Sequence, residues 1–238
     1  MIPTEEQIMI RNMARAFAVE QIAPYAAEWE DKAYFPREVF TAMGKLGLMG
    51  MTVPEEWGGA GLDYVTYAMA LEEIAAGDGA VAVVMSGHNS VGCMPILEFG
   101  SPAQKERYLR ALAQGEILCA FALTEAKGGS DAGALTTRAV RNGDSYVING
   151  SKQFITTGKN AELTLVFAVT DPEQGKRGIS AFIVPTDTPG YEVVRLEAKM
   201  GLNASDTAQL AFEDMRVPLD AMLGAEGQGY RIALGNLE

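Results

Sequence analysis

The stretch EILCAFALTE, residues 116–125, divides the chain into two parts of different character. Before it, apolar residues recur at helical spacing, as at Ile10, Met13 and Phe17. After it, short apolar and β-branched runs alternate with turn signals every ~8–12 residues, a spacing typical of β-sandwiches and barrels. Residues 117–123 of the stretch are all apolar and predict a first, buried strand.

These patterns predict an α+β fold. We expect an N-terminal α-helical domain at residues 1–116 and a middle antiparallel β-barrel or sandwich domain at residues 117–226. Side-chain capping patterns mark helix starts at Thr4, Asp63 and Ser101. The pair Asn142-Gly143 marks a hairpin. Residues 227–238 predict the start of a further amphipathic helix that the sequence does not complete.

Composition narrows the function classes. The 19 basic and 31 acidic residues give a formal net charge of −12, which argues against binding to nucleic acid or to anionic membranes. His88 is the single histidine, so multi-histidine metal sites are excluded and no metal is expected. Cys93 and Cys119 lack a CxxC spacing, which favours a reducing, cytoplasmic location. Polar residues interrupt the stretch 79–97, so no membrane span is expected.

One glycine-containing segment, residues 124–131, is a candidate ligand loop. Its glycine pair allows close backbone approach, and its N–H groups, with the hydroxyls of Thr124 and Ser130, suit a phosphate or carbonyl. An ordinary turn between strands explains the same residues. His88, among small residues, is more typical of a structural histidine than of a catalytic one.

A second candidate lies in residues 153–158. Phe154 and Thr156, two positions apart, share one face of a strand and offer a wall and a hydrogen bond to a flat heterocycle. A core phenylalanine beside an exposed threonine is the alternative. The glycine-rich residues 224–229 do not match a dinucleotide-binding pattern and predict a loop.

Several of these segments, in order along the chain, resemble motifs of the acyl-CoA dehydrogenase family. They are VPEEWGGAGLD (residues 53–63), FALTE followed by GSD (121–125 and 129–131), NGSKQFIT (149–156), SDT (205–207) and FEDMRVP (212–218). The resemblance runs from about Thr4 to the last residue. It implies a helical domain, a middle β domain and a C-terminal four-helix domain, of which most of the last is missing from this sequence.

The resemblance also implies an activity, the FAD-dependent oxidation of an acyl-CoA thioester to the 2-enoyl-CoA. A carboxylate base removes the α-proton while the β-hydrogen passes to the flavin as hydride. Carried over position by position, the residues implied to bind FAD are Phe121, Leu123, Thr124, Gly129, Ser130, Phe154, Ile155 and Thr156. The residues implied to bind the substrate are Ser130, Tyr230 and Glu238, and residues 83–91 are implied to close the acyl end of the pocket.

In most of the family the glutamate base belongs to the C-terminal domain, and no carboxylate of residues 1–238 matches it. We therefore expect no catalytic residue in this chain, which by itself should be inactive and bind FAD weakly. Residues 85–90 and 178–185 look closest to short-chain and short branched-chain members, in fatty acid or amino acid catabolism. The implied partners are an electron-transfer flavoprotein and further copies of the chain, as a tetramer or dimer.

Departures from the family pattern leave alternatives open. Ala126 and Lys127 replace the usual Pro and Gly, and Asn203 stands where Arg is frequent. A related flavin enzyme, such as an acyl-CoA oxidase or a flavin monooxygenase, is one alternative. A non-catalytic relative that kept the scaffold is the other.

Overall fold

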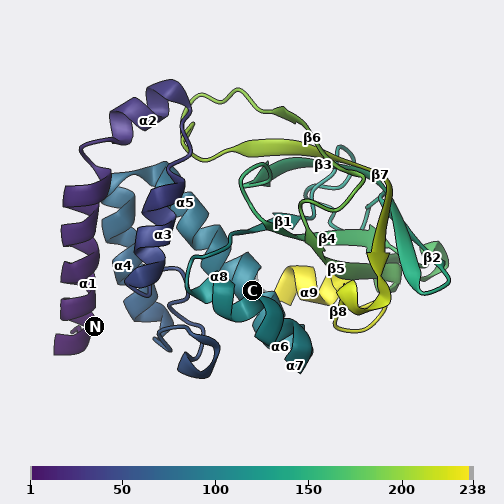
Figure 1. Ribbon diagram of the computed structural model, residues 1–238, viewed down its shortest axis with the longest axis horizontal. Coiled ribbons are helices and arrows are strands. Elements are labelled where there is room, and N and C mark those ends of the chain that lie inside the picture. Colours follow the sequence, from purple (N-terminus) through teal and green to yellow (C-terminus); the bar gives the residue numbers. More distant parts are fainter. Residues whose placement is uncertain (1, 236–238) are drawn as a thin grey trace.

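The computed structural model describes residues 2–235 and shows helices on one side of the molecule and a β-sheet on the other (Figure 1). Single π-helical turns connect α1 to Ala23, α5 to α6 and α7 to α8. The helices of the first part are α1 (Glu5–Phe17), α2 (Ala26–Lys32), α3 (Arg37–Lys45), α4 (Tyr64–Gly77), α5 (Gly79–Gly87), α6 (Met94–Phe99), α7 (Pro102–Gln104) and α8 (Arg110–Ala113).

The predicted helix starts are confirmed, because each is capped by the side chain that the sequence offers. Thr4 and Gln7 form a complete capping box, and Ser101 forms another with Gln104. The Asp63 carboxylate accepts from two backbone N–H groups at the start of α4. The sequence did not predict α2, since Trp29 is the one buried residue of this short helix and no apolar repeat reveals it.

Residues 79–99 form one continuous helix, although polar residues interrupt the apolar stretch 79–97. The helix passes through α5, a π-helical turn at His88–Cys93 and α6. By length and composition alone it is apolar enough to cross a membrane, but most of it is buried inside the fold. A core helix that is covered on several sides has the same composition.

The second part is a mixed β-sheet in the order β6-β7-β3-β2-β4-β5-β8, with β1 beside β4. Two of its pairings, β1 with β4 and β2 with β4, are parallel, whereas the sequence predicted an antiparallel domain. Hairpin signals reveal only neighbours in sequence, and these two pairs are brought together by long connections. The strands are β1 (Cys119–Ala122), β2 (Arg138–Asn142), β3 (Ser145–Thr156), β4 (Leu163–Val169), β5 (Ile179–Pro185), β6 (Tyr191–Leu196), β7 (Thr207–Pro218) and β8 (Met222–Leu223).

The sheet consists of two halves that meet at a single register pair between β2 and β4. Across the interior, the rings of Tyr146 on β3 and Phe182 on β5 lie 5.2 Å apart, edge to face. The predicted α+β class, with a helical part followed by a sandwich-like β part, is therefore confirmed. The last helix of the first part, α8, ends at Ala113 and β1 begins at Cys119, and the exact domain boundaries stay a prediction.

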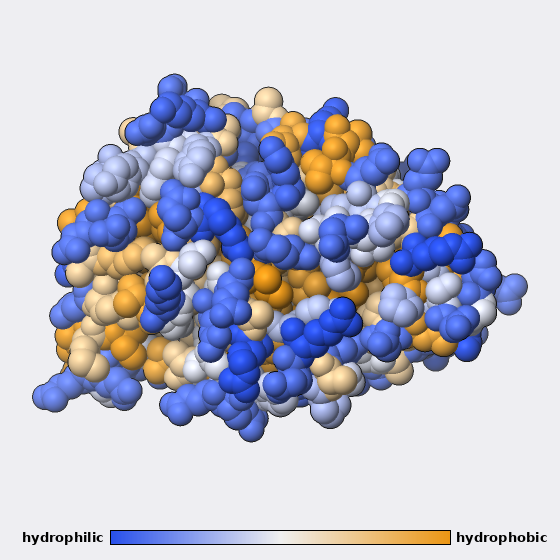
Figure 2. Space-filling view, viewed as in Figure 1, coloured by the Kyte–Doolittle hydropathy of each residue, from blue (hydrophilic) through white to orange (hydrophobic). Residues whose placement is uncertain are grey.

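The helical part and the sheet pack against each other through two shared clusters of buried apolar residues. Phe40 and Met85 of the helices belong to the same buried cluster as Leu210 and Met215 of β7. The predicted helix after residue 227 is present as α9 (Gly229–Gly235), which packs on β5. On the face drawn in Figure 2, apolar side chains gather over β6, an edge strand whose side chains are mostly exposed.

Candidate functional site

A cavity of about 220 Å³ lies where the buried helix, β1 and the end of β3 meet. Its walls come from segments far apart in the sequence. The lining residues are Val83, Val84, Gly87, His88 and Val91 of the helix, Cys119 and Phe121 of β1, and Phe154, Thr156 and Thr157 at the end of β3. The fold thus brings Phe121, Phe154 and Thr156 together with the stretch 83–91. A cavity of similar size between α7 and the ends of β5 and β7 contains none of the predicted site residues.

Phe154 has an unusual backbone and an unusual exposure. Its φ is +58°, in the left-handed region that favours glycine, and the residue is 60% exposed. The cause is a β-bulge, because the pairing of β3 with β7 shifts register between Lys152 and Ile155. The Gln153 N–H bonds instead to the Thr124 carbonyl at 2.8 Å. A large aromatic held exposed at some cost in strain is a feature of binding sites.

The residues after Phe154 separate into two environments. Thr156 lines the cavity and is half-buried, whereas the Ile155 side chain is 2% exposed and belongs to the core. Only the backbone of Ile155 is therefore available to a ligand in the cavity. The following turn is anchored by Asp206, whose carboxylate accepts from the Lys159 N–H at 2.9 Å and from the Asn160 amide at 2.8 Å.

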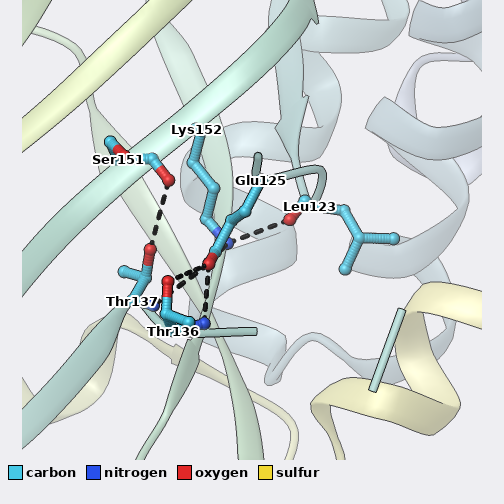
Figure 3. A network of polar contacts seen from close by, with 6 residues as sticks. All are labelled: Leu123, Glu125, Thr136, Thr137, Ser151 and Lys152. Atoms are coloured by element: carbon cyan, nitrogen blue, oxygen red, sulfur yellow. Dashed lines mark hydrogen bonds and ion pairs between the residues drawn. The ribbon is translucent and has the colours of Figure 1, made fainter. Parts of the chain in front are cut away.

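The loop that follows β1 is anchored by a buried ion pair (Figure 3). Lys152 Nζ lies 2.7 Å from Glu125 Oε1 and donates to the Leu123 carbonyl at 3.0 Å. Glu125 Oε2 accepts from the Thr136 N–H and hydroxyl, each at 2.6 Å, and the Thr137 N–H donates to the same carboxylate. The side chains of Lys152 and Glu125 are 0% and 2% exposed.

Both groups of the pair are charged at neutral pH. Burial by itself would raise the pKa of Glu125, but the Lys152 ammonium and the hydrogen bonds from Lys152 and Thr136 lower it to about 2. Burial lowers the pKa of Lys152 to about 8 against the attraction of Glu125. A motif glutamate that the sequence left without a role is therefore a structural anchor of this loop.

The other residues predicted from the loop do not line the cavity. The Leu123 side chain is buried in the core, and Thr124 contributes its carbonyl to Gln153. Gly129 and Ser130 lie on the exposed surface of the loop. A Cβ built on Gly129 meets no atom within 4 Å, so this backbone is open to a ligand.

Lys176 lies between Tyr230, at the start of α9, and the residues that follow this loop. The Lys176 ammonium is 4.8 Å from the centre of the Tyr230 ring, and its stem would lie 3.0 Å from a Cβ on Gly133. Interaction with the Tyr230 side chain raises the pKa of Lys176. No local sequence signal pointed to Lys176, because it lies in a separate turn. Glu238, the third predicted substrate residue, falls outside the described residues.

His88 is held by backbone groups on both sides of its ring. Nε2 is 2.9 Å from the Leu112 carbonyl, and Nδ1 accepts from the Cys119 N–H at 3.4 Å. Burial lowers its pKa to about 4, so the ring is neutral at pH 7. With both nitrogens engaged, His88 fits the structural role that the sequence favoured.

Comparison with known proteins identifies a protein family that matches this chain. The model of the acyl-CoA dehydrogenase N-terminal domain matches residues 4–116, and that of the middle domain matches residues 120–215. An acyl-CoA dehydrogenase of Bacillus subtilis is 50% identical over 98% of this chain and 62% of its own length. The mitochondrial short-chain specific acyl-CoA dehydrogenase of Rattus norvegicus is 45% identical over 98% of this chain and 57% of its own.

Similar solved structures point to the same family. The butyryl-CoA dehydrogenase of Megasphaera elsdenii has a TM-score of 0.96 and 39% identity, covering 100% of this chain and 63% of that one. A structure described as the electron transferring flavoprotein of Acidaminococcus fermentans gives 0.97 and 43%, covering 100% and 62%. A glutaryl-CoA dehydrogenase of Mycobacterium smegmatis in complex with FADH2 gives 0.91 and 34%, covering 98% and 60%.

The chain spans about three fifths of the length of the relatives that it matches. Within that span, two domain models in the family order cover most of the sequence, and the helical and β parts superimpose on solved members as one unit. The chain belongs to the acyl-CoA dehydrogenase family, of which it carries the N-terminal and middle domains.

Proposed function

We propose that this chain supplies the N-terminal and middle domains of an FAD-dependent dehydrogenase that converts short acyl-CoA thioesters to 2-enoyl-CoA. The observation that carries the proposal is the Phe154 ring, which is 60% exposed on a strained bulge beside a cavity. An exposed flat ring next to the Thr156 hydroxyl fits a flat heterocycle with polar edges. The relative in complex with FADH2 and the short-chain and butyryl-CoA names of other relatives support the cofactor and the substrate class.

FAD, when bound, accepts the β-hydrogen of the substrate as hydride. In the proposal, Phe154 offers a face for stacking, Thr156 offers a hydroxyl to the edge of the flavin, and the valines of 83–91 exclude water. Leu123, Thr124, Gly129 and Ser130 contribute mainly backbone groups and hydroxyls. No carboxylate lines the cavity within residues 2–235, so the proposal takes the base that removes the α-proton from elsewhere.

On the substrate side, we propose that Ser130, Tyr230 and Glu238 meet the acyl-CoA. Lys176, beside Tyr230, adds a cation for one of its phosphates. The relative described as an electron transferring flavoprotein supports a flavoprotein electron acceptor. We further propose a cytoplasmic homotetramer or homodimer acting in catabolism, and the two buried, unpaired cysteines fit a reducing compartment.

The test is a titration of the chain with FAD, followed by flavin fluorescence, and then anaerobic addition of butyryl-CoA. We expect FAD to bind and butyryl-CoA to leave the visible flavin band unchanged, because no carboxylate of residues 2–235 lines the cavity. Failure of FAD to bind overturns the flavin assignment, and bleaching by this chain alone overturns the assignment of the base.

A second measurement distinguishes a dehydrogenase from the alternative flavin enzymes. Chemically reduced flavin on the chain should reoxidise slowly in air and quickly with an electron-transfer flavoprotein. Fast reoxidation by O₂ would favour an acyl-CoA oxidase or a flavin monooxygenase instead.

A further inference from the structure

Three contacts between residues 123–125 and residues 152–153 form what we call the clamp. The Thr124 carbonyl accepts from the Gln153 N–H at 2.8 Å, and the Leu123 carbonyl accepts from Lys152 Nζ at 3.0 Å. The third contact is the buried ion pair of Lys152 with Glu125 at 2.7 Å. All three lie within two consecutive residues of β3, and Figure 3 shows Lys152 pointing between the Leu123 carbonyl and Glu125.

The clamp lies at the base of both segments to which the proposed function assigns the flavin. Glu125 opens the loop that contains Gly129 and Ser130, and its N–H and carbonyl each bond to Gly128 at 3.0 and 3.1 Å. Lys152 directly precedes the bulge that exposes Phe154. The bulge exists because Gln153 bonds to Thr124 rather than to β7, so the clamp fixes both segments relative to one another.

The hydrogen bonding of the Glu125–Lys152 pair fits a role in fixing the orientation of the loop on the strand. An apolar pair of the same volume is often at least as stable as a buried ion pair, so a buried ion pair fits a role in specifying an arrangement better than a role in adding stability. Here the Glu125 carboxylate is satisfied by Lys152, Thr136 and Thr137, each from a fixed direction. Hydrogen bonds of this kind select a single arrangement of the loop on the strand.

We propose that Glu125 and Lys152 are positioning residues that hold the loop 126–131 and the strand end 153–157 at the spacing a bound flavin requires. The pair acts through Phe154, Thr156 and the loop backbone, without touching the ligand itself. The inference rests on the proposed function for the identity of the ligand. The clamp itself is independent of it.

The experiment compares three variants of the chain, Glu125→Gln, Lys152→Met and the double variant with both changes. The double variant removes both charges and keeps the size of both side chains, so it should recover most of the stability that Lys152→Met loses. We expect it to bind FAD about tenfold more weakly than the wild type even so, a change of ~1.4 kcal/mol. Amide hydrogen exchange of residues 126–131 and 153–157 should stay faster than in the wild type.

The control is Arg37→Met with Glu162→Gln, which removes another ion pair, at 3.1 Å between α3 and the residue before β4; neither residue lines the cavity. This control should leave FAD affinity and the exchange of both segments unchanged. If the double variant regains wild-type FAD affinity and wild-type exchange along with its stability, the pair is only structural and the proposal is wrong. If the wild type does not bind FAD, the proposed function fails, and the exchange measurement still decides whether the clamp orders the two segments.

Discussion

Replacing Phe154 by glycine tests the candidate site directly, because the ring is exposed and its backbone is strained. At 60% exposure, about 120 Å² of a side chain of ~200 Å² is open. A flat ligand covering one face buries about 60 Å² of it, worth about 1.5 kcal/mol at 25 cal/mol/Å². Stacking adds ~0.5–1.5 kcal/mol. The expected loss is about 2–3 kcal/mol, a weakening of FAD binding by roughly 30- to 150-fold.

The Phe154→Gly substitution also changes the free energy of unfolding, independently of its effect on FAD binding. Glycine relieves the strain at φ +58°, roughly 1 kcal/mol, and costs ~0.5–1 kcal/mol in chain entropy, so these two effects nearly cancel. What remains is the loss of the buried 40% of the ring, about 80 Å² and ~2 kcal/mol. Leu202→Gly is a matched control, since Leu202 has φ +56° and is 47% exposed but does not line the cavity.

The assay is a fluorescence titration with FAD beside chemical denaturation of the same three proteins. Both variants should lose similar stability, and only Phe154→Gly should lose affinity. An FAD dissociation constant of Phe154→Gly close to that of the wild type would refute the assignment of the ring. An equal loss of affinity in Leu202→Gly would show that the effect comes from stability alone.

Three further predictions concern stability and binding. Because the pKa of native His88 is about 4 and that of the unfolded form is near 6.5, stability should be complete above pH 6.5 and fall by about 3 kcal/mol towards pH 4, measured by denaturation; His88→Gln should lack this part of the pH dependence. Gly44→Ala should lower stability by about 3 kcal/mol or more, because its Cβ would lie 2.0 Å from the Gln114 carbonyl oxygen. Gly87→Ala, whose Cβ would meet no atom within 4 Å, should be neutral or stabilising, and calorimetry measures both variants. Lys176→Gln should weaken binding of CoA, but not of a thioester without phosphates, in calorimetric titrations at low salt, and Lys105→Gln should leave both unchanged.

Much of the fold follows from short-range patterns. The capping side chains Thr4, Asp63 and Ser101 start helices where the sequence predicted, because a cap satisfies N–H groups within three residues of itself. Residues 163–169 form a fully buried strand and are one of the short apolar and β-branched runs that predict the β part. The parallel pairing of β1 with β4 was not predicted, because no local signal reports which distant strand a buried strand will choose.

In the candidate site too, local sequence patterns identified some features and long-range contacts decided the others. Sequence pattern and family resemblance named Phe154 and Thr156, but a regular strand would place Phe154 on the same face as the buried Lys152, and it explains neither the exposure of Phe154 nor its positive φ. The bulge that does so depends on Thr124, 29 residues away, taking the N–H of Gln153. The sequence assigned no role to Glu125, and only the fold buries it against Lys152.

The sequence by itself determined a helical part followed by a strand-rich part, the starts of the capped helices and the residue types available for a flavin site. These depend on capping, side-chain period and turn chemistry, which act within a few residues. Only the tertiary structure decided that the helix 79–99, β1 and the end of β3 surround one cavity, and that an ion pair joins the loop to the strand. Those juxtapositions arise from packing between segments distant in sequence, where the burial of apolar surface and the pairing of buried polar groups select one arrangement of the whole chain.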